Sequence, residues 1–369
     1  MKITGAALYE YAVHYLHGEY VMSGGRAAVE QQGLLLKLRT DTGVDGWAES
    51  TQLGSNYLPT SAGMTRAALE ELLPELIGSD PTNVLAIHQV MNDILLGGTS
   101  GKSAIDVACW DLRGKALGVS VSALLGGVIH PRFPLYEAVP LSSPEEMASF
   151  IDTRRATGIN RFQLKVGNDP RDDLERVRAA VDAGAPDTVI IADANGGWNL
   201  AQAEFALAAI DGLGVFVEQP CRTTRDSASV HRNCRSPLIL DESVTTAAEL
   251  YEARTLAAAT AVNIKLGRVG GITEAVRLRD LAQALGMMVT IEDTWGGDVA
   301  AAAVSHVAAT TRPDALLMAS FYNDWTDGHV AGYQPRSADG HGSAPDGPGL
   351  GITVDETLLP DPVFRLGDA

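Results

Sequence analysis

The segment FQLKVG, at residues 162–167, reads as a buried β-strand that ends in a charged residue. It is apolar except for Gln163 and Lys165, which are two residues apart and therefore lie on the same face of a strand. Burying an ammonium group is costly unless nearby groups compensate for its charge. The segment therefore predicts a strand whose polar end points into a site that holds negative charge.

Eight apolar runs of this kind follow one another from about residue 133, each separated from the next by a helical stretch rich in Ala, Leu and Arg. In chain order they are FPLYEAV, RFQLKVG, TVIIADAN, GVFVEQP, PLILDES, AVNIKLG, MMVTIED and ALLMASF. Polar residues near their ends, spaced by 28, 25, 23, 24 and 27 residues, are Lys165, Asp193, Glu218, Asp241, Lys265 and Glu292. Strands that alternate with helices predict a parallel sheet, and eight such units predict an α/β fold of the (β/α)8 TIM-barrel type.

The first third of the chain has a different pattern. ITGAALYEYAV and GLLLKLRTDTGVDGWAE predict antiparallel strands, the second run folding back at TDTG. Helical stretches are expected near residues 64–76, 83–95 and 102–117. We therefore predict an α+β domain over residues 1–125 and a barrel over residues 126–336. The Gly-, Pro- and Asp-rich segment at residues 337–369 is expected to return along the first domain.

Composition narrows the class of protein. The 369 residues carry a formal charge of −18, which makes binding to nucleic acid improbable because phosphate backbones would be repelled. No run approaches the roughly 20 apolar residues that span a bilayer, and the start of the chain is too polar for a secretory signal. The three cysteines have no metal-ligand spacing, which favours a reduced, cytoplasmic setting.

Three successive predicted strands each deliver one carboxylate, from Asp193, Glu218 and Asp241. In a barrel the carboxyl ends of the strands form the site of chemistry, so these groups are expected to converge. Their mutual repulsion is tolerable if a divalent cation lies between them, and an all-oxygen set of ligands suits Mg²⁺. The alternative is that each acid caps the following helix or pairs with a barrel lysine.

Lys165 and Lys265 lie on the second and sixth predicted strands, across the barrel from each other. A small ligand between them would therefore meet one lysine on each face. Partial burial and a nearby cation are expected to lower the pKa of these lysines toward a range useful for proton abstraction. The alternative is a purely structural pairing of both lysines with the acids.

The combination of QLKVG, ADANGGW, VEQP, LDES, NIKLGRVGG and EDTWGGD resembles the enolase superfamily, in particular the muconate-cycloisomerase-like subgroup of the mandelate racemase/muconate lactonizing enzyme family. The resemblance covers nearly the whole chain. It implies Mg²⁺ on Asp193, Glu218 and Asp241, with Asn195 and Glu242 behind these ligands. It also implies acid/base roles for the two lysines, and a capping domain whose loops near residues 20–26 and 52–59 close over the site.

Two features refine this resemblance. The mandelate-racemase subgroup would place a histidine on the seventh strand, where this chain has TIEDTWGGD without one. The matching subgroup usually has Lys-x-Lys on the second strand, whereas this chain has Gln163-Leu164-Lys165. Gln163 keeps a hydrogen-bond donor that could reach a substrate carboxylate, but it lacks the charge that would depress the pKa of Lys165.

The shared chemistry of the family is removal of the proton α to a carboxylate, which implies a small-molecule carboxylate substrate and an enolate intermediate. EDTWGGD and the YLP loop most resemble the group that acts on proline derivatives, with Tyr57, Asp293, Thr294 and Trp295 as candidate substrate-binding residues. Ordinary loop packing is the alternative for each of them. The resemblance favours dehydration of cis-3-hydroxy-L-proline to pyrroline-2-carboxylate, with 2-epimerisation of a proline betaine or another amino-acid derivative second.

A sugar-acid dehydratase is less favoured, since those enzymes usually carry the histidine that is missing here. In a different class, a non-catalytic barrel that binds metal or carboxylates would keep the three acids but have no use for both lysines. The resemblance also implies a homo-oligomer.

Overall fold

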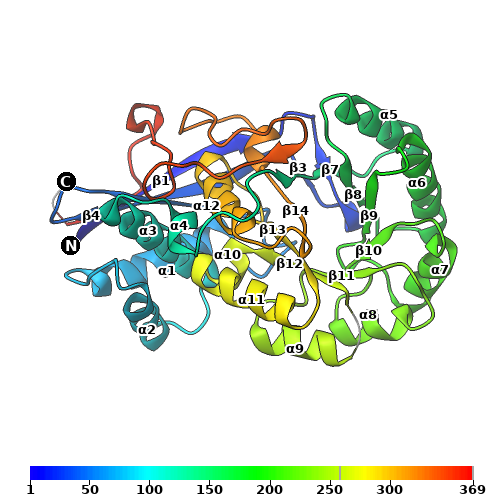
Figure 1. Cartoon of the computed structure of the whole chain (residues 1–369), viewed down its shortest axis with the longest axis horizontal. Coiled ribbons are helices and arrows are strands. Elements are labelled where there is room, and N and C mark those ends of the chain that lie inside the picture. Colours follow the sequence, from blue (N-terminus) through cyan, green and yellow to red (C-terminus); the bar gives the residue numbers. More distant parts are fainter. Residues whose placement is uncertain (257–258, 368–369) are drawn as a thin grey trace.

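A computed structural model of the chain describes residues 1–256 and 259–367. Its main sheet has eight parallel strands in chain order. Figure 1 shows how helices surround this sheet. A parallel bridge between Leu135 and Ala319 links the two edges of the sheet. The strands are β7 (Glu137–Val139), β8 (Arg161–Lys165), β9 (Val189–Asp193), β10 (Phe216–Glu218), β11 (Leu238–Leu240), β12 (Ala261–Lys265), β13 (Met288–Glu292) and β14 (Leu316–Ala319). The predicted fold class is confirmed.

A four-stranded antiparallel sheet forms the core of the N-terminal part. Its order is β16 (Phe364–Leu366), β1 (Ile3–His14), β4 (Glu30–Thr40) and β5 (Gly46–Thr51), so the end of the chain completes the sheet begun by its start. Helices α1 (Ala62–Leu72), α2 (Val84–Ile94) and α3 (Thr99–Leu117) follow, close to the helical stretches that the sequence predicts. The domain boundaries at residues 125/126 and 336/337 stay predictions. No helix in the described residues is both long enough and apolar enough to cross a membrane.

Five helices on the outside of the barrel begin with a side chain that caps their own N-terminus. They are α5 (Pro144–Arg155), α6 (Pro170–Ala183), α7 (Leu200–Ile210), α8 (Thr224–His231) and α9 (Ala247–Thr255), capped by Ser143, Asp169, Asn199, Thr223 and Thr246. Each capping oxygen accepts a backbone N–H that has no partner within the helix. These helices therefore start where their local sequence dictates.

Helices α11 (Ile272–Ala284) and α12 (Asp298–Ala309) begin differently. Each follows a glycine and has no capping side chain of its own. Asp106 on α3 supplies the cap for α11, accepting the backbone N–H of Thr273 at 3.0 Å. Glu49 on β5 caps α12, accepting the backbone N–H groups of Gly297 at 2.5 Å and Ala300 at 3.0 Å. The N-terminal domain thus caps the two helices that follow β12 and β13.

A glycine at position 271 is required for this arrangement. Its φ of 103° lies in the left-handed region, and a Cβ placed there would lie 2.3 Å from Oδ2 of Asp106. The carboxylate can therefore approach the start of α11 only because residue 271 has no side chain.

His306 joins α12 to two distant parts of the chain and is fully buried. Its Nδ1 accepts the backbone N–H of Ser122 at 3.2 Å, so Nε2 carries the proton and donates to the carbonyl of Leu350 at 3.1 Å. Burial lowers the pKa of His306 to about 4. The imidazole is therefore neutral in the folded protein at physiological pH.

We expect His306 to make stability depend on pH. Between its unfolded pKa of about 6.5 and its folded pKa of about 4, only the unfolded chain takes up the proton, so stability falls as pH falls. The loss is expected to be about 2 kcal/mol between roughly pH 7.5 and pH 5. Urea unfolding of the wild type and of His306→Gln at both pH values would measure it. An equal pH dependence in the two proteins would contradict the assignment.

Candidate active site

Six polar side chains lie at the carboxyl edge of the barrel, all of them at most 5% exposed. Five are the last residues of their strands and Asp241 directly follows β11. The register of the sheet makes them neighbours, because Asp193 pairs with Lys165 on one side and Glu218 on the other, while Lys265 pairs with Glu292. The structure thus brings together the acids and lysines that the sequence predicts, which are Lys165, Asp193, Glu218, Asp241, Lys265 and Glu292.

Lys165 is held by two acceptors. Its Nζ lies 2.5 Å from Oδ2 of Asp193 and 2.8 Å from Oε1 of Gln163. The amide nitrogen of Gln163 in turn donates to Oε2 of Glu218 at 2.9 Å. The donor that we expected Gln163 to offer to a substrate is therefore used within the protein, where it links Lys165 to Glu218.

Lys265 occupies the corresponding position on the other side. Its Nζ lies 2.9 Å from Oδ2 of Asp241, 2.7 Å from the hydroxyl of Tyr57 and 3.3 Å from Oε1 of Glu292. Asn263, two residues before Lys265, donates to Oε1 of Glu218. Gln163 and Asn263 are thus equivalent amides, one on each side of Glu218.

The pKa of both lysines is raised in this structure, opposite to the direction expected beside a bound cation. Burial lowers the pKa of Lys165, but the carboxylate of Asp193 opposes this effect and the net pKa is raised. For Lys265, burial is likewise outweighed by Asp241 and Glu292, which raise its pKa well above the ordinary range. Each ammonium lies directly against carboxylates, and this proximity stabilises the charged form.

Arg268 is a third buried cation that the sequence reasoning missed. Its Nη1 donates to Oδ1 of Asp241 at 2.6 Å and its Nη2 donates to the carbonyl of Asn263 at 2.9 Å. Burial alone would raise the pKa of Asp241, but Arg268 and Lys265 outweigh it and lower that pKa below its usual range. Arg268 follows Lys265 by one turn of the short helix α10 (Leu266–Val269), a spacing that could have pointed to it.

The three carboxylates offer only oxygen donors, the type of ligand that a hard cation such as Mg²⁺ prefers. No group of three or more His, Cys, Asp or Glu side chains in residues 1–256 and 259–367 is placed to hold a metal ion as it stands. Lys165 pairs with Asp193 and Lys265 pairs with Asp241, so each lysine lies against one of these carboxylates. Burial, together with the charges of Asp193 and Asp241, raises the pKa of Glu218 well above its usual value, which shows how crowded the negative charge is.

Asn195 and Glu242 lie beside these carboxylates. The amide nitrogen of Asn195 donates to Oδ2 of Asp193 at 2.9 Å and to Oε1 of Glu242 at 3.0 Å. The remaining oxygens, Oδ1 of Asn195 and Oε2 of Glu242, are buried without a protein hydrogen-bond partner. Burial, followed by repulsion from Asp241 and Asp193, raises the pKa of Glu242 to about 7. The free oxygens of Asn195 and Glu242 could therefore accept a hydrogen bond from a ligand or bind a cation.

The predicted residues after β13 are all buried but have different surroundings. Asp293 accepts the backbone N–H groups of Gly267 at 3.0 Å and Thr294 at 2.7 Å, so its carboxylate braces two loops. Burial raises the pKa of Asp293 to about 7. Trp295 stacks on Tyr322 with ring centroids 5.1 Å apart and also contacts Tyr20. The aromatic face predicted from Trp295 therefore belongs to a cluster of rings beside the lysines.

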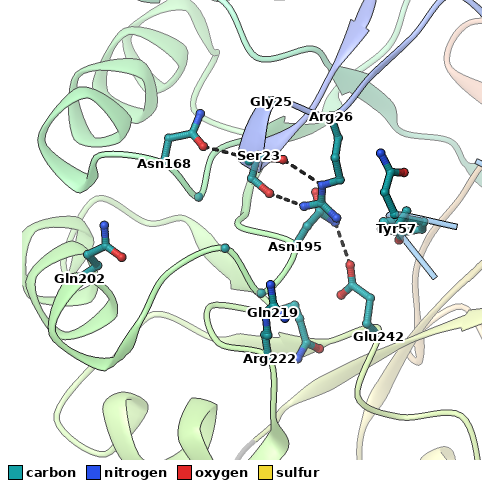
Figure 2. Close-up of a pocket in the computed structure, with 15 residues that line it drawn as sticks. Ser23, Gly25, Arg26, Tyr57, Asn168, Asn195, Gln202, Gln219, Arg222 and Glu242 are labelled. Atoms are coloured by element: carbon teal, nitrogen blue, oxygen red, sulfur yellow. Dashed lines mark hydrogen bonds between the residues drawn. The ribbon is translucent and has the colours of Figure 1, made fainter. Parts of the chain in front are cut away.

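A cavity of about 620 Å³ opens between the loops of the N-terminal domain and the loops that follow β8 to β11 (Figure 2). Arg26 lies over the ring of Tyr57 at 5.8 Å, which joins the two predicted lid loops. The backbone N–H of Gly24 donates to Asn168 at 2.9 Å, which docks the first loop on the barrel. Both lid loops therefore lie closed over the carboxyl edge.

Comparison with known proteins places the chain in a family. The family model for the mandelate racemase/muconate lactonizing enzyme N-terminal domain matches residues 17–126, and the enolase C-terminal domain-like model matches residues 146–358. A cis-3-hydroxy-L-proline dehydratase of Roseibium aggregatum is 38% identical over 365 residues, covering 99% of this chain and 100% of the relative. An N-succinyl-L-Arg/Lys racemase of Bacillus cereus is 33% identical and covers 85% of each chain.

Solved structures give the same result. A member of the enolase superfamily from Roseovarius nubinhibens, complexed with magnesium, superposes with a TM-score of 0.93 at 29% identity and covers 100% of both chains. The similarity therefore extends over the barrel and the N-terminal domain together.

The hydroxyl of Tyr57 is expected to hold the second lid loop closed. It accepts from Lys265 at 2.7 Å and donates to Oδ2 of Asp241 at 3.1 Å. Tyr57→Phe removes both bonds but keeps the ring beneath Arg26. Losing about 1 kcal/mol of hydrogen bonding should speed amide hydrogen exchange in residues 52–59 roughly 5- to 10-fold. Tyr251→Phe, at an exposed tyrosine on α9, is the matched control. Unchanged exchange in Tyr57→Phe would show that the Tyr57 hydroxyl does not hold this loop closed.

Proposed function

Because the chain belongs to the mandelate racemase/muconate lactonizing enzyme family of the enolase superfamily, we propose that it abstracts the proton α to a carboxylate and dehydrates cis-3-hydroxy-L-proline. One observation carries the proposal. Two buried lysines, at the ends of β8 and β12, flank a group of carboxylates at the mouth of the barrel. A barrel that served only for binding or support would have no chemical use for both.

The lysines supply acid and base on opposite faces of a substrate. In cis-3-hydroxy-L-proline the carboxylate and the hydroxyl share a ring face, so the α-proton lies on the face opposite the hydroxyl. One lysine can take this proton while the other protonates the departing hydroxyl, which leaves as water. The enamine then tautomerises to Δ¹-pyrroline-2-carboxylate. The 38% identity to a dehydratase with this substrate supports the assignment.

We further propose that Asp193, Glu218 and Asp241 hold Mg²⁺ during catalysis, with Asn195 and Glu242 supporting them. When bound, the ion would stabilise the negative charge that develops on the substrate carboxylate and would draw carboxylate charge away from the ammonium groups. The residues of the chain then have defined tasks. Gln163 and Asn263 orient Glu218, Arg268 orients Asp241, and the closed lid loops exclude water.

Epimerisation is the second candidate, and the N-succinyl-L-Arg/Lys racemase similarity supports it. Two lysines on opposite faces can remove a proton from one side and return it on the other. Dehydration and epimerisation thus share the geometry and differ in whether the substrate carries a leaving group at C3.

We also expect a cytoplasmic homo-oligomer. The three cysteines are all free, which agrees with a reducing compartment.

Proton NMR in D₂O with Mg²⁺ would test the substrate. We expect cis-3-hydroxy-L-proline to lose its C3 carbinol signal and to give a product that reacts with o-aminobenzaldehyde. EDTA should abolish this turnover. If 3-hydroxyproline is untouched while a proline betaine exchanges its α-proton, the protein is an epimerase and the dehydratase assignment is wrong.

Replacing either catalytic lysine should remove turnover without unfolding the protein. We expect Lys165→Met and Lys265→Met to lower kcat at least about 10³-fold, since each removes one proton-transfer group. Lys37→Met is the control, because Lys37 is also a buried lysine but pairs with Asp45 of the N-terminal domain and Glu356 of the C-terminal segment, away from the barrel mouth. Near-wild-type turnover in both variants would exclude the lysines. Exchange of the α-proton of a single enantiomer by each variant would favour epimerisation.

A further inference from the structure

Gln219, the residue directly after Glu218, has an unusual backbone and a fully buried side chain. Its φ of 35° lies in the left-handed region, which residues other than glycine seldom adopt. Such strain persists only where the surroundings enforce it, and it is common at functional sites. The surroundings of Gln219 therefore need an explanation.

The side-chain amide joins the end of β10 to the loop after β11. Oε1 accepts the backbone N–H of Asp241 at 2.8 Å and the hydroxyl of Ser243 at 3.2 Å. Nε2 donates to the carbonyl of Cys221 at 2.8 Å, which fixes the orientation of the amide. The side chain thus holds the backbone of Asp241 at a set distance from the residue that follows Glu218.

The backbone of Gln219 continues the connection in both directions. Its N–H donates to the carbonyl of Ile239 on β11 at 3.0 Å, and its carbonyl accepts the N–H of Gly196 at 2.7 Å. Gly196 lies three residues after Asp193, and Figure 2 shows Gln219 among the loops that line the cavity. One residue therefore bonds to the segments that carry all three carboxylates.

The left-handed backbone makes these contacts possible. In a regular strand, successive side chains point to opposite faces, so a residue after the inward-pointing Glu218 would turn away from the site. The kink at Gln219 breaks this alternation and directs the amide along the edge of the barrel toward Asp241. The unfavourable backbone conformation of Gln219 thus places its side-chain amide between the ends of β10 and β11.

We propose that Gln219 is a positioning residue that sets the spacing of the three carboxylates and thereby the strength with which they bind a divalent cation. Like charges at Asp193, Glu218 and Asp241 repel one another, so their strand ends need a brace that does not itself carry charge. A neutral amide with both its donor and its acceptor satisfied meets that requirement. This inference rests on the proposed function, because it assumes that these carboxylates hold Mg²⁺.

Isothermal titration of Mg²⁺ into the wild type and Gln219→Met tests the proposal. The substitution keeps the length of the side chain and removes the amide. We expect Mg²⁺ binding to weaken roughly 10- to 100-fold, as is usual when a residue that orients metal ligands is lost. The Mg²⁺ concentration for half-maximal turnover should rise in parallel, with kcat partly restored at saturating Mg²⁺.

Gln202→Met is the matched control. Gln202 is an amide of the same cavity, but its oxygen accepts the N–H of Asn199 in the capping box of α7. Its loss should lower stability slightly and leave Mg²⁺ affinity unchanged. Gln219→Gly is the second test variant, because it relieves the left-handed backbone while still removing the amide. Gln219→Gly should weaken Mg²⁺ binding as Gln219→Met does. This holds even if relief of the backbone strain raises the unfolding temperature of the variant.

A folded Gln219 variant that binds Mg²⁺ within about twofold of the wild type would overturn the proposal. If the wild type binds Mg²⁺ and dehydrates its substrate while the variants match it, only the role of Gln219 fails. If the wild type binds no Mg²⁺, the metal part of the proposed function fails and this inference fails with it.

Discussion

The compensation of buried charge at one edge of the barrel is the constraint on which the rest of the site depends. Three cations, Lys165, Lys265 and Arg268, lie among four carboxylates, Asp193, Glu218, Asp241 and Glu292. Leaving such a group without a partner would cost several kcal/mol. Asp193, Asp241 and Glu292 lie against cations, whereas Glu218 accepts hydrogen bonds from the amides of Gln163 and Asn263. The carboxylates still outnumber the cations before Glu242 is counted. That excess of negative charge is what a divalent cation would neutralise.

The barrel and the charged residues at its strand ends were predictable because both follow from the repeated alternation of a strand and a helix. A strand and a helix of ordinary length fix the spacing of about 25 residues between Lys165, Asp193, Glu218, Asp241 and Lys265. Parallel strands then place these residues at one edge regardless of the helices between them. The helices of the N-terminal domain were predictable for a related reason, since α1, α2 and α3 each carry their own apolar periodicity.

What could not be predicted depends on contacts between distant segments. Gln163 was expected to face a substrate, but its partner is Glu218, 55 residues away. Asn263 and Arg268 both lie in the motif NIKLGRVGG, but their partners, Glu218 and Asp241, lie at the ends of other strands and meet them only when the barrel closes. The direction of the lysine pKa shifts in this structure depends on atoms a few ångströms away. The sequence identifies the residues that carry these atoms, but it does not specify how far the atoms lie from the lysine nitrogens.

The two helices that Asp106 and Glu49 cap have a consequence for protein engineering. Because α11 and α12 start at glycines and borrow a carboxylate from the other domain, the barrel cannot be treated as an interchangeable module. A chimera that joined this barrel to the N-terminal domain of a relative would need acids at the positions of Glu49 and Asp106, with Gly271 retained. Recombination within the family is therefore restricted by two sets of hydrogen bonds, from Asp106 to α11 and from Glu49 to α12. A library that exchanges the loops over the site to obtain new substrates should keep both sets.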